Sequence, residues 1–270
     1  MKPRPFAYIK PQSLDEALTA LARHGESARV LAGGQSLIAM LNLRLVETAA
    51  LIDISRLSEL SQIRVTGNVL EVGAGVTQNT LLAWPQLATR LPLLAKTLPS
   101  VGHFQTRNRG TVCGSIAHAD PSSELPLALA MLDGEVVLQS RRGTRQLKAS
   151  AFQTGVLSTA REPDELITAV RFPLDRSKTA AFREVSRRQG DFAIVAVGAY
   201  KLNANTVRLG IGGAADRPFV TEITTGHSVA DQIEQIVWNL GGYEDIHATP
   251  HLRRDLVRKV APLVITEACA

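Results

Sequence analysis

The sequence predicts an α+β fold with a boundary near residue 176, so that a larger first domain precedes a smaller second one. Strand and helix patterns alternate over residues 1–54, which indicates a small β-α-β-like unit. A strongly β-patterned run over 166–172 stops at Pro173, and the polar segment 175–179 is typical of a linker. A group of strands and then helices follows, as expected of a separate α+β domain.

The first unit begins with a helix whose two ends are marked in the sequence. Ser13 is a suitable N-cap, and Glu16 three residues later completes a capping box. Gly25 is expected to end the helix. The pattern then predicts a short buried strand over 29–32, a turn over 33–36, a helix over 37–43 and a strand over 50–54.

Residues 55–175 complete the first domain. The pattern predicts a strand around 69–73, a helix from 76 to 84, a second helix near 91–98, a hairpin of 135–138 with 144–147, and the run at 166–172. In the second domain, 176–270, it predicts strands over 181–186, 193–202 and 207–211, then helices over 229–240 and 252–265.

Composition excludes several classes of function. The net charge of +5 favours anionic ligands or acidic partner surfaces. Aromatic residues make up only 4%, which argues against a stacking platform for nucleic acid. No apolar run reaches the length of about 18 residues that a membrane span needs, and no secretory signal pattern follows the basic N-terminus. We therefore expect a cytoplasmic protein.

The two cysteines, Cys113 and Cys269, form neither a metal-ligand pattern nor a disulfide framework. An iron–sulfur cluster usually needs four cysteine thiolates. If the chain exchanges electrons with such a cluster, the cluster is therefore held by another polypeptide.

Two glycine-containing segments are candidates for an anion site. The first, 32–36, reads Ala-Gly-Gly-Gln-Ser between a predicted strand and helix, where successive N–H groups and a helix N-terminus suit a diphosphate. The second, 109–115, is interpreted as another turn, with glycines, hydroxyls and the nearby cations Arg107 and Arg109. Either segment alone is equally consistent with a turn that binds nothing. His118 and Asp120 follow, and both acid–base catalysis and a positioning role are open to them.

Together the motifs resemble a known family. Their order and spacing are similar to those of the FAD-binding medium subunit of the molybdenum hydroxylases, such as carbon monoxide dehydrogenase, and of the xanthine dehydrogenase flavin domain. The motifs that carry the resemblance are 32–36, 107–115 with 118–121, 166–173 and 186–193. The resemblance covers nearly the whole chain. It implies a two-subdomain FAD-binding domain of the vanillyl-alcohol-oxidase type over 1–175, with subdomains 1–54 and 55–175, and a C-terminal α+β domain over 176–270.

The resemblance also implies which residues bind FAD, without a covalent link, and it implies no catalytic or metal-binding residue on this chain. Phe192 matches a position beside the isoalloxazine ring, where an aromatic side chain packs well on a flavin. The implied diphosphate contacts are Val30, Leu31, Ala32, Gly33, Gly34, Gln35, Ser36, Leu37, Thr111, Gly114 and Ser115. The implied contacts to the flavin or ribityl chain are Val101, Asp120, Glu124, Ile167 and Arg183.

One position departs from the family, which usually has Gly where this chain has Cys113. A cysteine would be strained there if the position required a positive φ. Gly114 is therefore the safer diphosphate contact. Glu124 is also longer than the Asp found in some relatives.

By resemblance, the chain is an electron-transfer subunit of an oxidoreductase. The resemblance implies that a large subunit with a molybdenum cofactor oxidises the substrate and that [2Fe-2S] clusters on a small subunit pass electrons to FAD here. The assembly it implies is a dimer of heterotrimers. One alternative is a self-contained FAD-dependent oxidoreductase with the same flavin fold. A second is a non-enzymatic interaction module that has lost its flavin, for which Cys113 is the one supporting feature.

Overall fold

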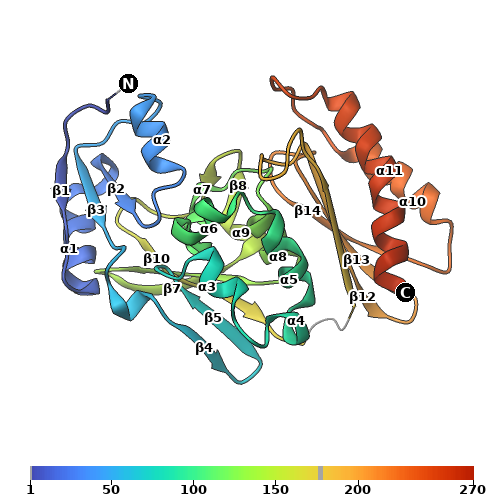
Figure 1. Cartoon of the computed structure of the whole chain (residues 1–270), viewed down its shortest axis with the longest axis horizontal. Coiled ribbons are helices and arrows are strands. Elements are labelled where there is room, and N and C mark those ends of the chain that lie inside the picture. The colour runs from blue at the N-terminus through green and yellow to red at the C-terminus, as the bar shows by residue number, and fades with distance from the viewer. Residues whose placement is uncertain (1, 176–178) are drawn as a thin grey trace.

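The computed structural model describes residues 2–175 and 179–270. The chain forms three units that follow one another in Figure 1, from the N-terminal strands in blue to the C-terminal helices in red. Each unit has its own main sheet with helices packed beside it, and this mixture of strands and helices agrees with the predicted α+β fold.

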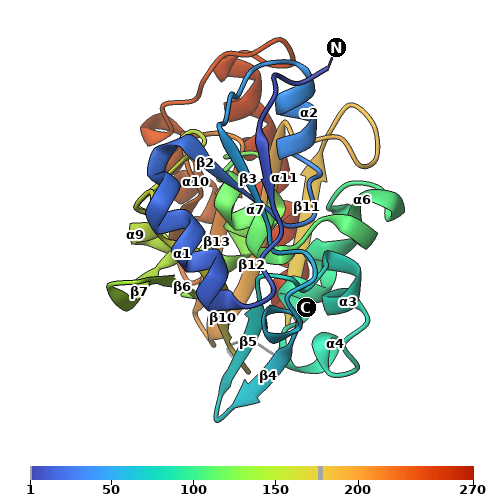
Figure 2. The same ribbon diagram turned by 90° about the vertical axis from the view of Figure 1, so that its left-hand side faces the viewer.

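The first unit is a parallel three-stranded sheet, in the order β1-β3-β2, with two helices. Its elements are β1 (Ala7–Ile9), α1 (Leu14–His24), β2 (Ala28–Leu31), α2 (Leu37–Asn42) and β3 (Ala50–Asp53). Figure 2 shows this unit foremost. Strand β1 was not predicted, because a run of three residues is too short to show a strand pattern.

The ends of α1 are as the sequence predicts. The Ser13 hydroxyl accepts the N–H of Glu16 at 3.2 Å, and Gly25 follows the helix with φ of 51°. The capping box is shifted by one residue, because the Glu16 carboxylate accepts the N–H of Gln12 at 2.7 Å. The apolar face of α1 is buried through Ala17, Leu18 and Leu21.

The second unit is an antiparallel five-stranded sheet in the order β4-β5-β10-β6-β7, covered on one face by helices. Its main strands are β4 (Ile63–Thr66), β5 (Val69–Gly73), β6 (Glu135–Ser140), β7 (Gly143–Lys148) and β10 (Leu166–Pro173), beside a small pair, β8 (Gln153–Gly155) and β9 (Ser158–Thr159). Its helices are α3 (Gln78–Leu82), α4 (Leu87–Arg90), α5 (Pro92–Thr97), α6 (Phe104–Arg109), α7 (Val112–His118), α8 (Glu124–Met131) and α9 (Ala149–Phe152).

The interpretation of 109–115 as a turn is wrong. Arg109 ends α6, Thr111 is the N-cap of α7, and Gly114 and Ser115 lie inside α7. Glycines and hydroxyls hid the helix in the sequence. The helix forms because Val112, Cys113 and Ile116 bury one face of it in the core, which outweighs the weak local propensity.

The third unit is an antiparallel sheet, β11-β12-β13-β14, packed on two helices. Its elements are β11 (Ala180–Val185), β12 (Val195–Asn203), β13 (Thr206–Gly212), β14 (Phe219–Thr224), α10 (Val229–Asn239) and α11 (Pro250–Cys269). Figure 1 shows the sheet between α8 on one side and α10 and α11 on the other. Strand β14 was not predicted. Part of the predicted linker, 176–178, lies outside the described residues.

The third unit packs closely on the second. Gly198 and Gly210 face Met131 of α8, and a Cβ on Gly198 would come within 2.8 Å of the Met131 sulfur. The buried Tyr200 hydroxyl donates to the Met131 carbonyl at 2.8 Å. The N–H of Gly213 donates to the Pro121 carbonyl at 2.8 Å. These contacts fix α8 and the loop before it against the C-terminal sheet.

The division of the chain at 54/55 and at 175/176 stays a prediction, although residues 180–269 do contain a second apolar core around β12, β13 and α11. Among residues 2–175 and 179–270, no helix has the length and apolar character needed to cross a membrane.

Candidate functional site

The first glycine segment presents a row of free backbone donors. Gly33, Gly34, Gln35 and Ser36 lie between β2 and α2, and their amide N–H groups donate no hydrogen bond within the described chain. Gly34 has φ of 73°, which a residue with a side chain adopts only with strain. Such a run of N–H groups suits the oxygens of an anionic ligand.

The two glycine segments meet. A Cβ on Gly33 would overlap the carbonyl oxygen of Arg109 and lie 2.7 Å from the Cα of Gly110. Sequence reasoning explained Gly33 by close approach to a ligand, but in the structure the missing side chain makes room for the second segment. The proximity of the two segments, which the sequence left open, is therefore a property of the fold.

Thr111 organises the second segment. Its hydroxyl oxygen accepts the N–H of Gly114 at 3.0 Å, which leaves the hydroxyl hydrogen available to donate. The flanking backbone is held by residues at the start of α3 and just before it. The N–H of Val112 donates to the Val76 carbonyl at 3.1 Å, and that of Gln78 donates to the Gly110 carbonyl at 2.8 Å. The segment is thus fixed without a ligand.

Cys113 is not strained. It lies in α7, it is absent from the residues with positive φ, and its buried Sγ is 3.5 Å from the Val72 carbonyl oxygen. Burial raises the pKa of the Cys113 thiol well above its usual range. The side chain therefore faces the core. The strain expected of a cysteine at a positive φ does not arise, because Cys113 has helical backbone angles.

An acidic pair lies near the end of α7. Asp120 Oδ1 accepts the N–H of Ser122 at 2.8 Å, and Glu124 begins α8 with only 3% of its surface exposed. Burial raises the pKa of Glu124 to about 8, with smaller contributions from Glu184 and Asp120. Burial also raises the pKa of Glu184 to about 7. Both carboxyls are thus largely or partly protonated at neutral pH.

Glu184 was missed by sequence reasoning, which selected its neighbour Arg183. In the sheet register, Glu184 is opposite Ala196 of the first core and Arg183 is opposite Val197 of the second. Because side chains alternate along a strand, Glu184 faces α8 and Arg183 faces α11. Accordingly, the Arg183 guanidinium pairs with Glu267 of α11 at 3.2 Å. The period-2 pattern of β11 was the available signal.

The remaining predicted residues take different positions. Val101 and Ile167 are almost fully buried, at the start of the loop before α6 and on β10. Phe192 lies between β11 and β12, and 53% of its surface is exposed. A Cβ on Gly190 would lie 2.6 Å from the Nδ1 of His103, so the loop that carries Phe192 rests on the loop that carries Val101.

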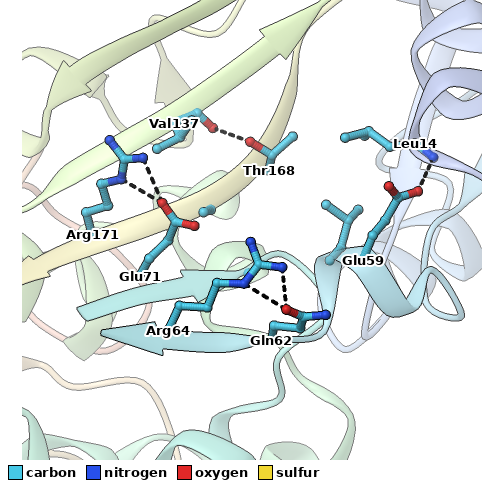
Figure 3. A pocket seen from close by; sticks show the side chains of 11 residues that line it. Leu14, Glu59, Gln62, Arg64, Glu71, Val137, Thr168 and Arg171 are labelled. Atoms are coloured by element: carbon cyan, nitrogen blue, oxygen red, sulfur yellow. Dashed lines mark hydrogen bonds and ion pairs between the residues drawn. The ribbon is translucent and has the colours of Figure 1, made fainter. Parts of the chain in front are cut away.

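Two cavities lie away from these segments. The first, of about 340 Å³, is shown in Figure 3 and contains two arginines that already have partners: Arg171 pairs with Glu71 at 2.8 Å, and Arg64 donates to the Gln62 side chain. The second, of about 240 Å³, is lined by Gly25, Glu26, Arg29, Arg161 and Pro163. Neither lining includes the glycine segments.

The amino-acid sequence is similar to a known family and to several known proteins. A family model described as the FAD binding domain in molybdopterin dehydrogenase matches residues 4–175. The glyceraldehyde dehydrogenase medium chain of Sulfolobus acidocaldarius is 38% identical over 224 residues, 81% of this chain and 79% of that one. The caffeine dehydrogenase subunit beta of a Pseudomonas species is 37% identical over 81% of this chain and 76% of that one.

Solved structures extend the similarity over the whole chain. Quinoline 2-oxidoreductase from Pseudomonas putida 86 superposes with a TM-score of 0.91 at 33% identity, covering 100% of this chain and 98% of that chain. A carbon monoxide dehydrogenase from Hydrogenophaga pseudoflava, described as lacking the Mo-pyranopterin moiety of its molybdenum cofactor, gives a TM-score of 0.91 at 28% identity over 99% and 98%. The C-terminal unit is thus part of the shared fold.

Proposed function

The chain belongs to the family of FAD-binding domains of molybdopterin dehydrogenases, and from this premise we propose that it relays electrons from iron–sulfur clusters on a partner subunit, through bound FAD, to an external acceptor. It is an FAD-binding oxidoreductase subunit of the molybdenum hydroxylase family. The relay, the partners and a cytoplasmic location are parts of the proposal. The observation that carries it is the pair of glycine segments that meet at Gly33 and Arg109.

The residues present fit FAD. The four adjacent N–H groups of residues 33–36 offer donors for the phosphates of a dinucleotide. The second segment, which meets the first at Gly33, adds the hydroxyl of Thr111. Phe192 leaves an aromatic face exposed for a planar ring. We propose that the diphosphate contacts are those of Gly33, Gly34, Ser36 and Thr111, and that Val101, Glu124 and Ile167 line the rest of the flavin. No contact of Arg183 is proposed, because its side chain faces α11.

Bound FAD supplies two-electron and one-electron redox chemistry, and the chain itself has to bind, orient and shield it. The chain has two cysteines, and Cys113 is buried in the core. These thiols are too few for an iron–sulfur cluster, which supports a partner that carries the clusters. The named relatives are medium or beta chains, a description that supports a small iron–sulfur subunit and a large molybdenum subunit as partners.

Purification from the native host tests the relay. An affinity-tagged chain should recover two other subunits in equal amounts, one with bound iron and sulfide and one with molybdenum. The isolated chain should release non-covalent FAD on denaturation and should not oxidise an organic substrate. Recovery of the chain alone, with turnover of an organic substrate at about 1 per second or faster, would support a self-contained flavin oxidoreductase instead.

A visible absorption spectrum distinguishes the remaining alternative. An interaction module that has lost its cofactor would purify colourless and would not bind added FAD. A flavin spectrum from the folded chain excludes that alternative, whatever its partners are.

A further inference from the structure

We infer that Arg107 is a positioning residue for the FAD site. It contacts no cofactor atom in this proposal and acts by holding two loops, 99–103 and 186–192, in one arrangement. This inference rests on FAD binding by this chain, and it concerns a side chain that none of the expected cofactor contacts includes. Three observations carry it: the hydrogen bonds of Arg107, the contact between the two loops, and the position of α6.

Arg107 holds the first loop through its carbonyl oxygens. One terminal nitrogen, Nη1, lies 3.2 Å from the Pro99 oxygen, 3.0 Å from the Val101 oxygen and 2.7 Å from the Gly102 oxygen. Gly102 has φ of 55° within this loop. The Nε of Arg107 is buried and has no hydrogen-bond partner in the described chain. The contacts to the loop therefore have to offset the burial of the guanidinium.

The first loop supports the second. A Cβ on Gly190 would lie 2.6 Å from the His103 Nδ1 and 3.1 Å from the carbonyl carbon of Gly102. Gly190 itself has φ of 84°. The second loop is braced internally, since Asp191 accepts from Arg188 at 3.2 Å and its N–H donates to the Arg188 carbonyl at 3.1 Å. A shift of residues 102–103 would thus carry Gly190 with it, and Phe192 lies two residues further on.

The position of α6 connects the two loops, 99–103 and 186–192, to the second glycine segment, 109–115. Arg107 is in α6, whose end leads directly into Gly110 and Thr111. The N–H of Gly110 donates to the Thr106 carbonyl of the same helix at 2.6 Å. Figure 2 shows α6 at the edge of the molecule. The backbone of this short helix thus holds the start of the second glycine segment. The Arg107 side chain of the same helix holds the loop of Val101, on which the loop of Phe192 rests.

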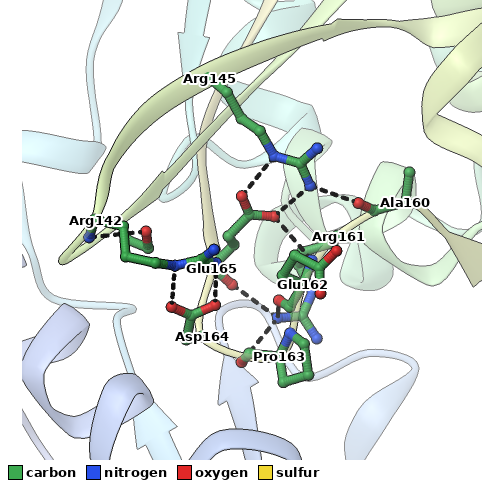
Figure 4. A network of polar contacts seen from close by, with 9 residues as sticks. Arg142, Arg145, Ala160, Arg161, Glu162, Pro163, Asp164 and Glu165 are labelled. Atoms are coloured by element: carbon green, nitrogen blue, oxygen red, sulfur yellow. Dashed lines mark hydrogen bonds and ion pairs between the residues drawn. The ribbon is translucent and has the colours of Figure 1, made fainter.

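The test compares Arg107→Gln with a matched variant, Arg161→Gln. The Nη1 of Arg161 also contacts three carbonyl oxygens of one loop, those of Glu162, Pro163 and Glu165, as the network in Figure 4 shows. Both variants should lose similar stability in urea unfolding. We expect Arg107→Gln to raise the dissociation constant for FAD about tenfold and Arg161→Gln to change it less than about twofold. Arg107→Lys should lose less FAD affinity than Arg107→Gln, since an ammonium also carries N–H donors for the carbonyl oxygens of the loop.

A double-mutant cycle with Phe192→Leu gives a readout that a merely structural role would not move. If Arg107 acts through the loop that carries Phe192, the effects of Arg107→Gln and Phe192→Leu on FAD affinity should be non-additive. The double variant should then bind FAD about as tightly as the single variant with the lower affinity. Additive effects would overturn the inference, and so would equal FAD affinities for Arg107→Gln and wild type. If the wild-type chain binds no FAD at all, the assignment of the cofactor fails instead.

Discussion

Gly33 lies directly against the backbone of Arg109, in a space that no side chain can enter. The contact joins the turn after β2 to the end of α6, two segments that are more than 70 residues apart. It brings the first segment, with its free N–H groups, against the backbone of Arg109 and Gly110, which leads directly into Thr111. The proposed diphosphate site therefore depends on the absence of one Cβ.

Gly33→Ala should separate the two segments. The added methyl group would overlap the Arg109 carbonyl, and overpacking of this kind costs roughly 1–3 kcal/mol. We expect a lower melting temperature and a loss of FAD affinity of about tenfold or more, measured by flavin fluorescence quenching. Gly226→Ala is the control, because a Cβ there has no atom within 4 Å. Unchanged FAD affinity in Gly33→Ala would remove this contact from the site.

Cys113→Gly places the glycine that the resemblance leads one to expect, but it should not improve flavin binding. The side chain packs in the core, so the variant should lose about 1–3 kcal/mol from a small cavity and from glycine within a helix. Its FAD affinity should stay within about twofold of wild type. Cys113→Ala separates the two contributions to stability. A large gain in affinity in the glycine variant would mean that Cys113 does obstruct the diphosphate.

The stability of the flavin-free chain should fall as pH rises from about 4.5 to 8. Glu124 has a pKa of about 8 in the folded chain and Glu184 about 7, both above the ordinary value of 4.5. The folded state therefore keeps protons that the unfolded state releases, so the contribution of these two carboxyls to stability is fully present below about pH 4.5 and is lost as pH rises through the folded pKa values. Each such proton contributes a slope of at most about 1.4 kcal/mol per pH unit.

Glu124→Gln should flatten this profile, since an amide has no proton to lose. Urea unfolding at several pH values between 5 and 9 measures it. Glu162→Gln serves as the control, because its carboxylate is exposed and near the surface network of Figure 4. An equally steep profile in Glu124→Gln would show that the buried carboxyl is not the source of the pH dependence.

Arg253→Met should destabilise the C-terminal unit strongly. Only 1% of the Arg253 surface is exposed, and its guanidinium pairs with Asp245 at 2.7 Å and donates to the Ile194 and Gly213 carbonyls at 2.7 and 2.8 Å. Removing the guanidinium leaves these two carbonyls without their donor, and each buried polar group that loses its partner costs about 1–3 kcal/mol. Arg254→Met, on the next residue of α11, should cost less than about 1 kcal/mol. Chemical unfolding of both variants compares them, and similar losses would contradict the role of the buried guanidinium.

The sequence by itself determined the local elements with strong signals and the family. Ser13 and Gly25 mark the ends of α1 because capping is a local interaction, and the β-patterned run of β10 ends at Pro173 because proline lacks an N–H. The order of motifs along the chain was sufficient to recognise an FAD-binding domain. These features depend on neighbours within a few residues, so they can be predicted without knowledge of the fold.

Only the tertiary structure decided which distant residues meet and which way they face. The helix α7 forms because its apolar face is buried, although its glycines and hydroxyls resemble a turn. Arg183 and Glu184 are adjacent in sequence, and sheet register alone assigns one to α11 and the other to α8. The meeting of Gly33 with Arg109 likewise depends on the packing of two units. Such contacts join residues far apart in the chain, and local pattern carries no information about them.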